Sequence, residues 1–365
     1  MSVSLKHFVD VNIKQHVSSA ILGTRKTVAL FTDEKKQSVT DMLVTSDNYE
    51  DSCQGMTATL QSLKVFFDNG GQEAHVYCDT TEIASSSSFA EKVLALPQDY
   101  VCVAVAAKDS TTGHTAIVAT AKALDASADF YGISKKILLS RIPIDSIESA
   151  SIDADCLAVK VSSVQGAEMT MAAYLSKINV YDIDSVYDYM YTVENIEPQA
   201  NVTDTQYEAI IAKNLNIDIE LSSRVRNCGG NMTNGADLVN SYVLILLHQT
   251  VTARLLELLS QKIKSEDGIS KIYAVISQEL GNYLTCGYLT TDKVWTDPDL
   301  IISYNNENYT VIETGTALTD GYVVKVLPFS SLTENDKALH KTPPIYVVLA
   351  SQYGIRAITI NGEVI

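Results

Sequence analysis

The chain has 365 residues, of which 46% are hydrophobic and 19% are charged, a composition that is ordinary for a globular protein of two or three domains. It carries 27 Lys and Arg against 44 Asp and Glu, which gives a formal net charge of −17. Because such a charge repels phosphate groups, the composition excludes non-specific nucleic-acid binding and recruitment to anionic membranes as expected functions.

No targeting or cofactor signal occurs along the sequence. The amino-terminal stretch MSVSLKHFVDVNIKQHV lacks the continuous apolar run of a signal peptide, and nowhere do about 18 apolar residues run together. We therefore expect an unexported chain with no membrane insertion. The six cysteines are widely scattered without a CxxC pair, so we expect buried free thiols, no metal site and no cofactor.

The first half alternates apolar, strand-like runs with helical patterns. Strands are predicted at residues 27–32, 74–78, 101–107, 136–142 and 157–161. Helices are predicted at residues 54–67, 89–96, 115–125 and 167–177. This order is typical of an α/β layer with a partly parallel sheet. The polar stretch NIEPQANVTDTQ at residues 195–206 then indicates a boundary or a long surface excursion.

The hexapeptide FFDNGG ends the first helical pattern, in which Met56, Leu60, Leu63 and Phe67 recur at helical spacing. Asn69 tolerates a left-handed backbone and both glycines adopt positive φ without a Cβ clash, so the sequence predicts a helix C-cap. A phosphate-binding loop is not indicated, because the glycines end a helix and neither GxGxxG nor a Walker lysine follows.

The second half places helices before strands. Residues 237–264 are predicted to form one long, mostly buried helix, which Gly268 is expected to break, and a second helix is predicted to end near Gly287. The runs NYTVIE and GYVVKVLP are predicted to be antiparallel strands. This order indicates an α+β module.

Both ends of the chain carry strand periodicity, although chain termini are normally polar and frayed. Val9, Val11 and Ile13 share one face near the amino terminus, and Ile358 and Ile360 share one face near the carboxyl terminus. Such strands either pair within their own subunit or add to the sheet of a neighbour by β-augmentation.

Catalytic motifs are missing from the sequence. It contains no HExxH, HxH or GxSxG, and His248 lies in an apolar helix, where a core histidine is the better interpretation. The carboxylates are scattered, and paired-carboxylate catalysis depends on a proximity that a sequence does not show. We therefore expect no enzymatic activity.

Residues 41–77 resemble a segment of contractile tail sheath proteins, in which a polar loop precedes a helix that ends in FFxNGG and an apolar strand follows. Four further stretches follow in the family order: SSAILGTRKTVALFTDE, the two long helical patterns, DKVWTDPDL and the carboxy-terminal tail. The tail is similar to the short-sheath branch of some myophages. The motif residues are Phe66, Phe67, Asn69, Gly70, Gly71, Trp295, Asp297 and Pro298. Proteins of this sheath family occur in myovirus-type bacteriophages and in phage-derived contractile injection systems.

The resemblance implies an α/β outer domain plus an α+β inner domain with extended N- and C-terminal β-strand arms. Residues 1–25 would form the amino-terminal arm as part of the inner domain, 26–236 the outer domain, 237–345 the inner assembly domain and 346–365 the carboxy-terminal arm. Val9, Val11, Ile13, Ile358 and Ile360 would then lie in arm strands that add to the sheets of neighbouring subunits.

The resemblance also implies a structural subunit that polymerises as stacked hexameric rings around a tail tube. Contraction of the resulting sleeve would drive the tube through the envelope of the target cell. The expected partners are further copies of the chain, the tail tube protein, and baseplate and tail terminator proteins. The expected location is a virion tail assembled in the host bacterial cytoplasm.

One feature departs from the family. In some sheaths a basic patch on the second carboxy-terminal helix grips an acidic tube, but residues 272–284 contain Glu279 and no Lys or Arg. Either nearby cations take over the tube contact, or the tube is held by other chemistry. The nearby cations are Arg254, Lys262, Lys264 and Lys271 just upstream, and Lys337 and Lys341 downstream.

Two other functions remain open from the sequence. A doubly wound α/β enzyme with a helical cap would explain the alternating first half, and it predicts a pocket with convergent polar groups at the strand ends. Another tail structural component, such as a tube or baseplate protein, would also explain self-assembly.

Overall fold

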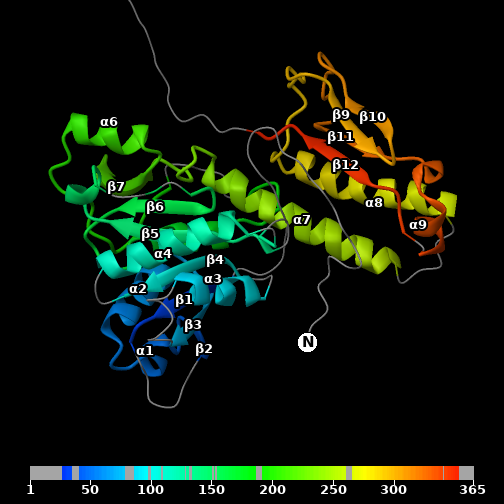
Figure 1. Cartoon of the computed structure of the whole chain (residues 1–365). Helices are drawn as coiled ribbons and strands as arrows, with labels where there is room; N and C mark the ends of the chain where they lie inside the picture. Colours follow the sequence, from blue (N-terminus) through cyan, green and yellow to red (C-terminus); the bar gives the residue numbers. More distant parts are fainter. Residues whose placement is uncertain are drawn as a thin grey trace, which may run out of the picture.

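The computed structural model describes residues 27–34, 41–78, 86–97, 100–107, 110–127, 129–130, 134–149, 152, 154–185, 191–259, 265–339 and 341–352. The predicted arm residues Val9, Val11, Ile13, Ile358 and Ile360 lie outside these ranges, as do Lys262 and Lys264. The described part forms two lobes, and one long helix runs from the first into the second (Figure 1).

Within the described ranges, the larger lobe is built on an eight-stranded sheet in the order β2-β3-β1-β4-β5-β6-β7-β8. Its strands are β1 (Thr27–Thr32), β2 (Asp41–Thr45), β3 (Glu73–Cys78), β4 (Tyr100–Ala106), β5 (Ile137–Ile142), β6 (Leu157–Val161), β7 (Asn216–Leu221) and β8 (Arg224–Cys228). The strands between the two edges are parallel, and the edge strands β2 and β8 are antiparallel to their neighbours. The predicted partly parallel α/β sheet is thereby confirmed.

Helices cover both faces of this sheet. They are α1 (Tyr49–Ser52), α2 (Thr57–Asp68), α3 (Ser86–Ala95), α4 (Ser110–Asp125), α5 (Met169–Ser176) and α6 (Asp204–Ala212). Alternate residues of a strand enter different cores, as the pleat requires. In β1, Val28 and Leu30 join the core that contains α2 and α5, whereas Ala29 and Phe31 join the core that contains α3, α4 and α6.

The end of α2 explains the glycines of FFDNGG. The Gly71 N–H donates to the Phe66 carbonyl at 3.0 Å and the Gly70 N–H donates to the Phe67 carbonyl at 2.9 Å, the two bonds of a Schellman motif. Gly70 has φ 86°, but Asn69 has φ −92°, so the predicted left-handed backbone at Asn69 is wrong. Gly71 is required for a steric reason instead, because an added Cβ would lie 2.3 Å from the Phe66 ring.

A buried charge aligns the last strands of the sheet. Lys160 of β6 is fully buried, and its Nζ lies 2.6 Å from Asp218 Oδ1 of β7 and 2.8 Å from both Asn227 Oδ1 of β8 and Thr170 Oγ1 of α5. Burial lowers the pKa of Lys160, and the charge of Asp218 opposes this shift. Because an ammonium has three donors and all three have partners here, we interpret the cluster as structural.

Two long helices follow the sheet. The first, α7 (Leu238–Leu259), is buried continuously from Leu238 to His248 and packs into the same core as α2 and α5. The second, α8 (Ser265–Thr285), packs against α7. Gly268 lies inside α8, so the helix break predicted at this glycine is wrong.

The smaller lobe contains β9 (Leu300–Tyr304), β10 (Glu307–Ile312), β11 (Tyr322–Val326), α9 (Glu334–Ala338) and β12 (Ile345–Leu349). In the described part of the chain, β9 pairs with β10 and β11 pairs with β12, both antiparallel. The runs NYTVIE and GYVVKVLP are indeed strands, but each pairs with a different partner and not with the other. One face of the β11–β12 sheet packs toward α8, and the other packs on the cluster around Trp295.

We predict that Gly71→Ala destabilises the protein by about 1–3 kcal/mol, the usual result of overpacking a rigid site. Phe66 is fully buried and has no room to move away from the added methyl group. Gly281→Ala is the matched control, because no atom lies within 4 Å of the added Cβ and the position is inside α8. The control should stabilise the protein by about 0.5–1 kcal/mol. Urea unfolding followed by circular dichroism measures both, and equal midpoints would contradict the steric explanation.

We also predict that Asp218→Ala lowers the free energy of unfolding by about 3–5 kcal/mol, because it leaves a buried ammonium without its counter-charge. Asp68→Ala removes the exposed partner of Lys64 and should cost no more than about 1 kcal/mol. The same denaturation assay applies. If the two variants lose the same stability, the Lys160 cluster does not align the strands in the way described.

Candidate assembly surfaces and the strand-end cleft

Asn69 of FFDNGG fastens the end of α2 to residues 191–196. Its side-chain Nδ2 donates to the Glu194 carbonyl at 3.0 Å, and its Oδ1 accepts from the Glu194 N–H at 2.9 Å. These residues run along β8, where the Val193 N–H donates to the Val225 carbonyl at 2.9 Å. An uncovered edge strand is a template for pairing with another chain. The motif therefore helps to cover the β8 edge of the sheet.

Trp295 of WTDPDL closes the smaller lobe in a similar way. Its indole N–H donates to the Pro298 carbonyl at 3.1 Å, and the hydroxyl of Thr314 donates to the Asp297 carbonyl at 2.7 Å. The ring packs in the cluster that contains Val311 of β10 and Val348 of β12. Both sequence motifs thus hold distant segments together, and neither presents reactive groups.

The β11–β12 sheet, like the β9–β10 sheet, has only two strands in the described part of the chain. As far as the chain is described, neither of its outer edges pairs with a further strand. Ribbons of two strands are marginally stable in water and are normally completed by other strands or by packing. The described chain continues from β12 to Gln352, and the predicted arm-strand residues Ile358 and Ile360 follow in the sequence. This sheet is the candidate acceptor for arm strands.

The candidate tube-contact residues have different environments. Arg254 is half-exposed, and its Nε and one terminal nitrogen lie 3.1 Å and 3.2 Å from carboxylate oxygens of Glu279 and Glu257. Glu279 is only 3% exposed, so its carboxylate faces α7 and not the solvent. Lys271 is exposed near the start of α8. Lys262 and Lys264 fall outside the described residues.

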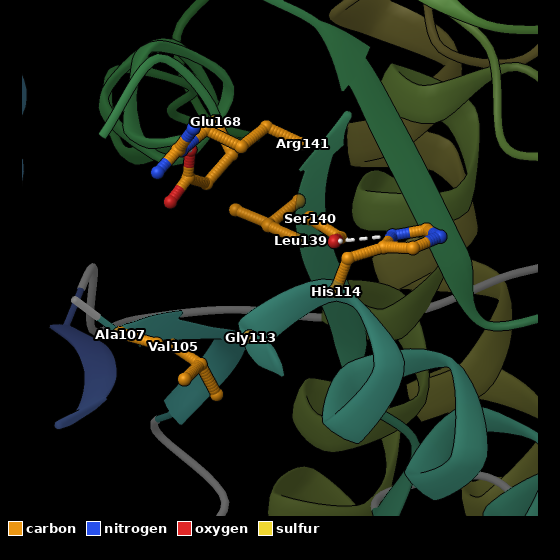
Figure 2. A pocket seen from close by; sticks show the side chains of 8 residues that line it. All are labelled: Val105, Ala107, Gly113, His114, Leu139, Ser140, Arg141 and Glu168. Carbon is orange, nitrogen blue, oxygen red and sulfur yellow. Dashed lines mark hydrogen bonds and ion pairs between the residues drawn. The ribbon is translucent and has the colours of Figure 1, made fainter. Parts of the chain in front are cut away.

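A cleft at the carboxyl ends of β4 and β5 tests the enzyme alternative. It is lined by Val105, Ala107, Gly113, His114, Leu139, Ser140, Arg141 and Glu168 (Figure 2). Its cavity volume is about 10 Å³, room for about one water molecule, whereas a typical ligand pocket has roughly 300–1,000 Å³.

The polar groups of the cleft are paired with one another. His114 Nδ1 lies 2.9 Å from the Ser140 hydroxyl oxygen, and Arg141 Nε lies 3.2 Å from Glu168 Oε2. Burial raises the pKa of Glu168, and the charge of Arg141 opposes this shift. The carboxylate of the cleft is therefore held by the arginine, and it does not complete a triad with the serine and the histidine.

The amino terminus of α2 is occupied by the chain itself. In doubly wound nucleotide-binding folds, a ligand phosphate lies at the helix that follows the first strand. Here Glu34 fills this position, since its Oε2 accepts from the Thr59 N–H at 2.9 Å and from the Thr59 hydroxyl at 3.0 Å. Glu34 is 4% exposed. A carboxylate thus already bonds one backbone N–H and one hydroxyl at the helix end where a phosphate would bind.

The described ranges hold neither a group of metal-ligand side chains nor a membrane-spanning helix. No group of three or more His, Cys, Asp or Glu side chains there could hold a metal ion. No helix there combines the length and the apolar character that a membrane span needs.

Comparison with known proteins gives a match in structure alone. No protein-family model matches the sequence, and no curated protein matches it. A sheath complex of an extracellular contractile injection system, PVC, in the contracted state is similar with a TM-score of 0.58 and 12% identity, over 97% of this chain and 96% of that chain. A sheath tail protein from Desulfitobacterium hafniense is similar with a TM-score of 0.53 and 11% identity, over 80% of this chain and 94% of that chain.

Both similar structures are sheath proteins, and the match with the PVC protein extends over nearly the whole of both chains. The resemblance found in the sequence is thereby confirmed at the level of the fold, without distinguishing the short-sheath branch. The chain has the fold of a contractile tail sheath protein.

Proposed function

We propose that the protein is the structural subunit of a contractile tail sheath and not an enzyme. The observation that carries this proposal is the fold shared with a contracted sheath complex over 97% of the chain. The strand-end cleft supports it, because its polar groups are paired and a carboxylate fills the phosphate position at α2. No observation favours a tube or baseplate protein over a sheath.

In this proposal the two lobes have separate roles. The larger lobe corresponds to the outer domain of residues 26–236, and α7, α8 and the smaller lobe correspond to the inner domain of residues 237–345. Residues 1–25 and 346–365 supply the arms. Because Ile345–Leu349 forms β12 and pairs with β11 of the same chain, the part that reaches a neighbouring subunit starts after Leu349.

The arms would complete the β11–β12 sheets of neighbouring subunits. Val9, Val11, Ile13, Ile358 and Ile360 would supply the apolar faces of the added strands. Two open edges on one small sheet provide room for two strands, one from each kind of arm. Subunits joined in this way form stacked hexameric rings around the tube and remain connected while the rings move.

Contraction then needs no nucleotide. The extended sleeve is held by its contacts with the tube, and a signal from the baseplate releases it into a wider and shorter lattice. The energy comes from the difference between two sets of interfaces, as in other transitions between two packings. The remaining proposed partners are the tail terminator and further copies of the chain, in a virion tail assembled in the bacterial cytoplasm.

We predict that the full-length protein forms striated hollow sleeves and that a variant lacking residues 1–14 and 355–365 remains monomeric. Removing the arms leaves the described lobes intact but takes away the strands that complete neighbouring sheets. Negative-stain electron microscopy of the two proteins at the same concentration gives the answer. A full-length protein that stays monomeric at high concentration would refute the sheath proposal. Sleeves formed by the truncated variant would refute only the role of the arms.

We also propose that the cations in the segment from α7 to the first half of α8 contact the tube. The triple variant with Lys262, Lys264 and Lys271 changed to Glu should bind the tube protein more weakly and still polymerise. Arg254 is left unchanged, because it holds Glu279. Lys64, Lys122 and Lys177 are exposed lysines on the larger lobe, and their change to Glu gives a control with the same net charge. Co-sedimentation with tubes measures binding, and an equal loss in both variants would indicate a general effect of charge.

A further inference from the structure

Residues 179–185 connect the larger lobe directly to both long helices. The Tyr181 hydroxyl lies 2.9 Å from Thr250 Oγ1 of α7 and 3.2 Å from Glu279 Oε2 of α8. Its ring meets the buried ring of Tyr283 edge-on, with the centroids 6.4 Å apart. The side chain of Tyr181, in the loop that follows α5, therefore contacts α7 and α8 at the same time.

The loop that carries Tyr181 is anchored in the core on the amino-terminal side of this residue. Ile178 and Val180 are each 2% exposed and belong to the core of the larger lobe. Within the loop, the Asn179 N–H donates to the Ser185 hydroxyl at 2.7 Å, and the Ser185 N–H donates to the Asp182 carbonyl at 3.0 Å. These bonds hold the loop in a folded shape that presents Tyr181 to the helices.

Glu279 makes this contact more than a surface hydrogen bond. Its two carboxylate oxygens have different partners, since Oε1 accepts from Arg254 Nε at 3.1 Å and Oε2 accepts from Tyr181. The side chain is almost completely buried, and a buried carboxylate needs partners to offset the loss of water. The buried carboxylate of Glu279 on α8 therefore keeps its second partner only while the larger lobe holds Tyr181 against it.

We propose that Tyr181 is a lock that holds the α7–α8 pair at a fixed angle to the eight-stranded sheet. Helix α7 is buried without a break only from Leu238 to His248, in the core that it shares with the sheet, so its second half and α8 are free to bend relative to the sheet. A second attachment from the sheet to α8 removes this freedom. Under the proposed function, on which this consequence rests, release of the lock would let a subunit change shape between two lattices.

The environment of Tyr181 suits a contact that opens and closes. Its side chain is 42% exposed, so water replaces the lost partners when it leaves. Arg254 still bonds Oε1 of Glu279 when Tyr181 leaves, so the carboxylate keeps a charged partner and the closed state is favoured without being permanent. The Lys160 cluster differs in this respect, because its ammonium is fully buried and separation would strand the charge.

Distances between the lobes test the proposal on the dilute, unassembled full-length chain. Spin labels at Ser149→Cys on the larger lobe and Ser303→Cys on the smaller lobe report the separation, in a background that carries Cys286→Ser. Both label sites are exposed, and the other five cysteines are buried. Tyr181→Phe removes only the hydroxyl, and Glu279→Gln removes only the charge. Tyr309→Phe is the matched control, because the Tyr309 hydroxyl bonds Glu307 on an exposed hairpin.

We expect a narrow distance distribution in the parent and in Tyr309→Phe, and a broader distribution in both Tyr181→Phe and Glu279→Gln. Hydrogen exchange of the amides in residues 179–185 should become about fivefold to tenfold faster in Tyr181→Phe, the factor that matches the loss of one hydrogen bond. Unchanged distance distributions in both variants would overturn the lock, even with faster local exchange. Sleeve formation is not part of this readout, so failure of the sheath proposal leaves the result interpretable.

Discussion

The fold depends on the burial of α7 in a hydrophobic core that both lobes share. Leu30 and Leu139 of the large sheet, Leu247 of α7 and Val347 of β12 all belong to one continuous cluster. Burying apolar surface is the main favourable term in folding, at roughly 25 cal/mol per Å², so neither lobe reaches its full stability without the helix between them. A force applied to the small β11–β12 sheet is therefore transmitted through close-packed side chains to the larger lobe. Under the proposed function the subunit moves as part of a lattice, and this transmission of force between its lobes matters more there than a ligand pocket.

The same interior also explains why few polar groups in the described chain are available to bind a small ligand. Polar groups that could recognise a substrate bind other groups of the chain. Glu34 accepts a hydrogen bond from the start of α2, and Arg141 forms an ion pair with Glu168. Lys160 donates to three neighbouring side chains. Residues 191–196 cover the β8 edge of the large sheet. Strand edges do remain without a partner strand in the described chain, among them the two edges of the β11–β12 sheet. Unpaired strand edges recognise other strands and not metabolites, which favours assembly over catalysis.

The sequence predicted those parts of the fold that leave a local pattern. The strands at residues 27–32 and 157–161 have the same bounds in the structure, because parallel strands buried on both faces form unbroken apolar runs. The partners of β10 and β11 were not predictable, since pairing depends on contacts far apart in the chain. The bond of Asn69 to Glu194 joins residues 125 positions apart and leaves no local signal. Lys160 did leave a local signal. It is a lone charge inside the apolar run LAVKV, and a charge in such a buried position indicates a buried partner. Tyr181 left none, because a single tyrosine in a polar loop is ordinary.

The single carboxylate on the second half of α8 takes on a different meaning in the structure. Judged from the sequence alone, Glu279 places a negative charge on a helix where some sheaths carry a basic patch. In the structure it faces α7, where Arg254 and Tyr181 satisfy it, so it adds little field at the outer surface of the helix. In the first half of α8, Lys271 is an exposed positive charge. An acidic partner is therefore not repelled here, although the chain as a whole carries a net charge of −17. At physiological ionic strength, charges beyond about 8 Å are largely screened, so the local sign of the surface decides which partner this helix accepts.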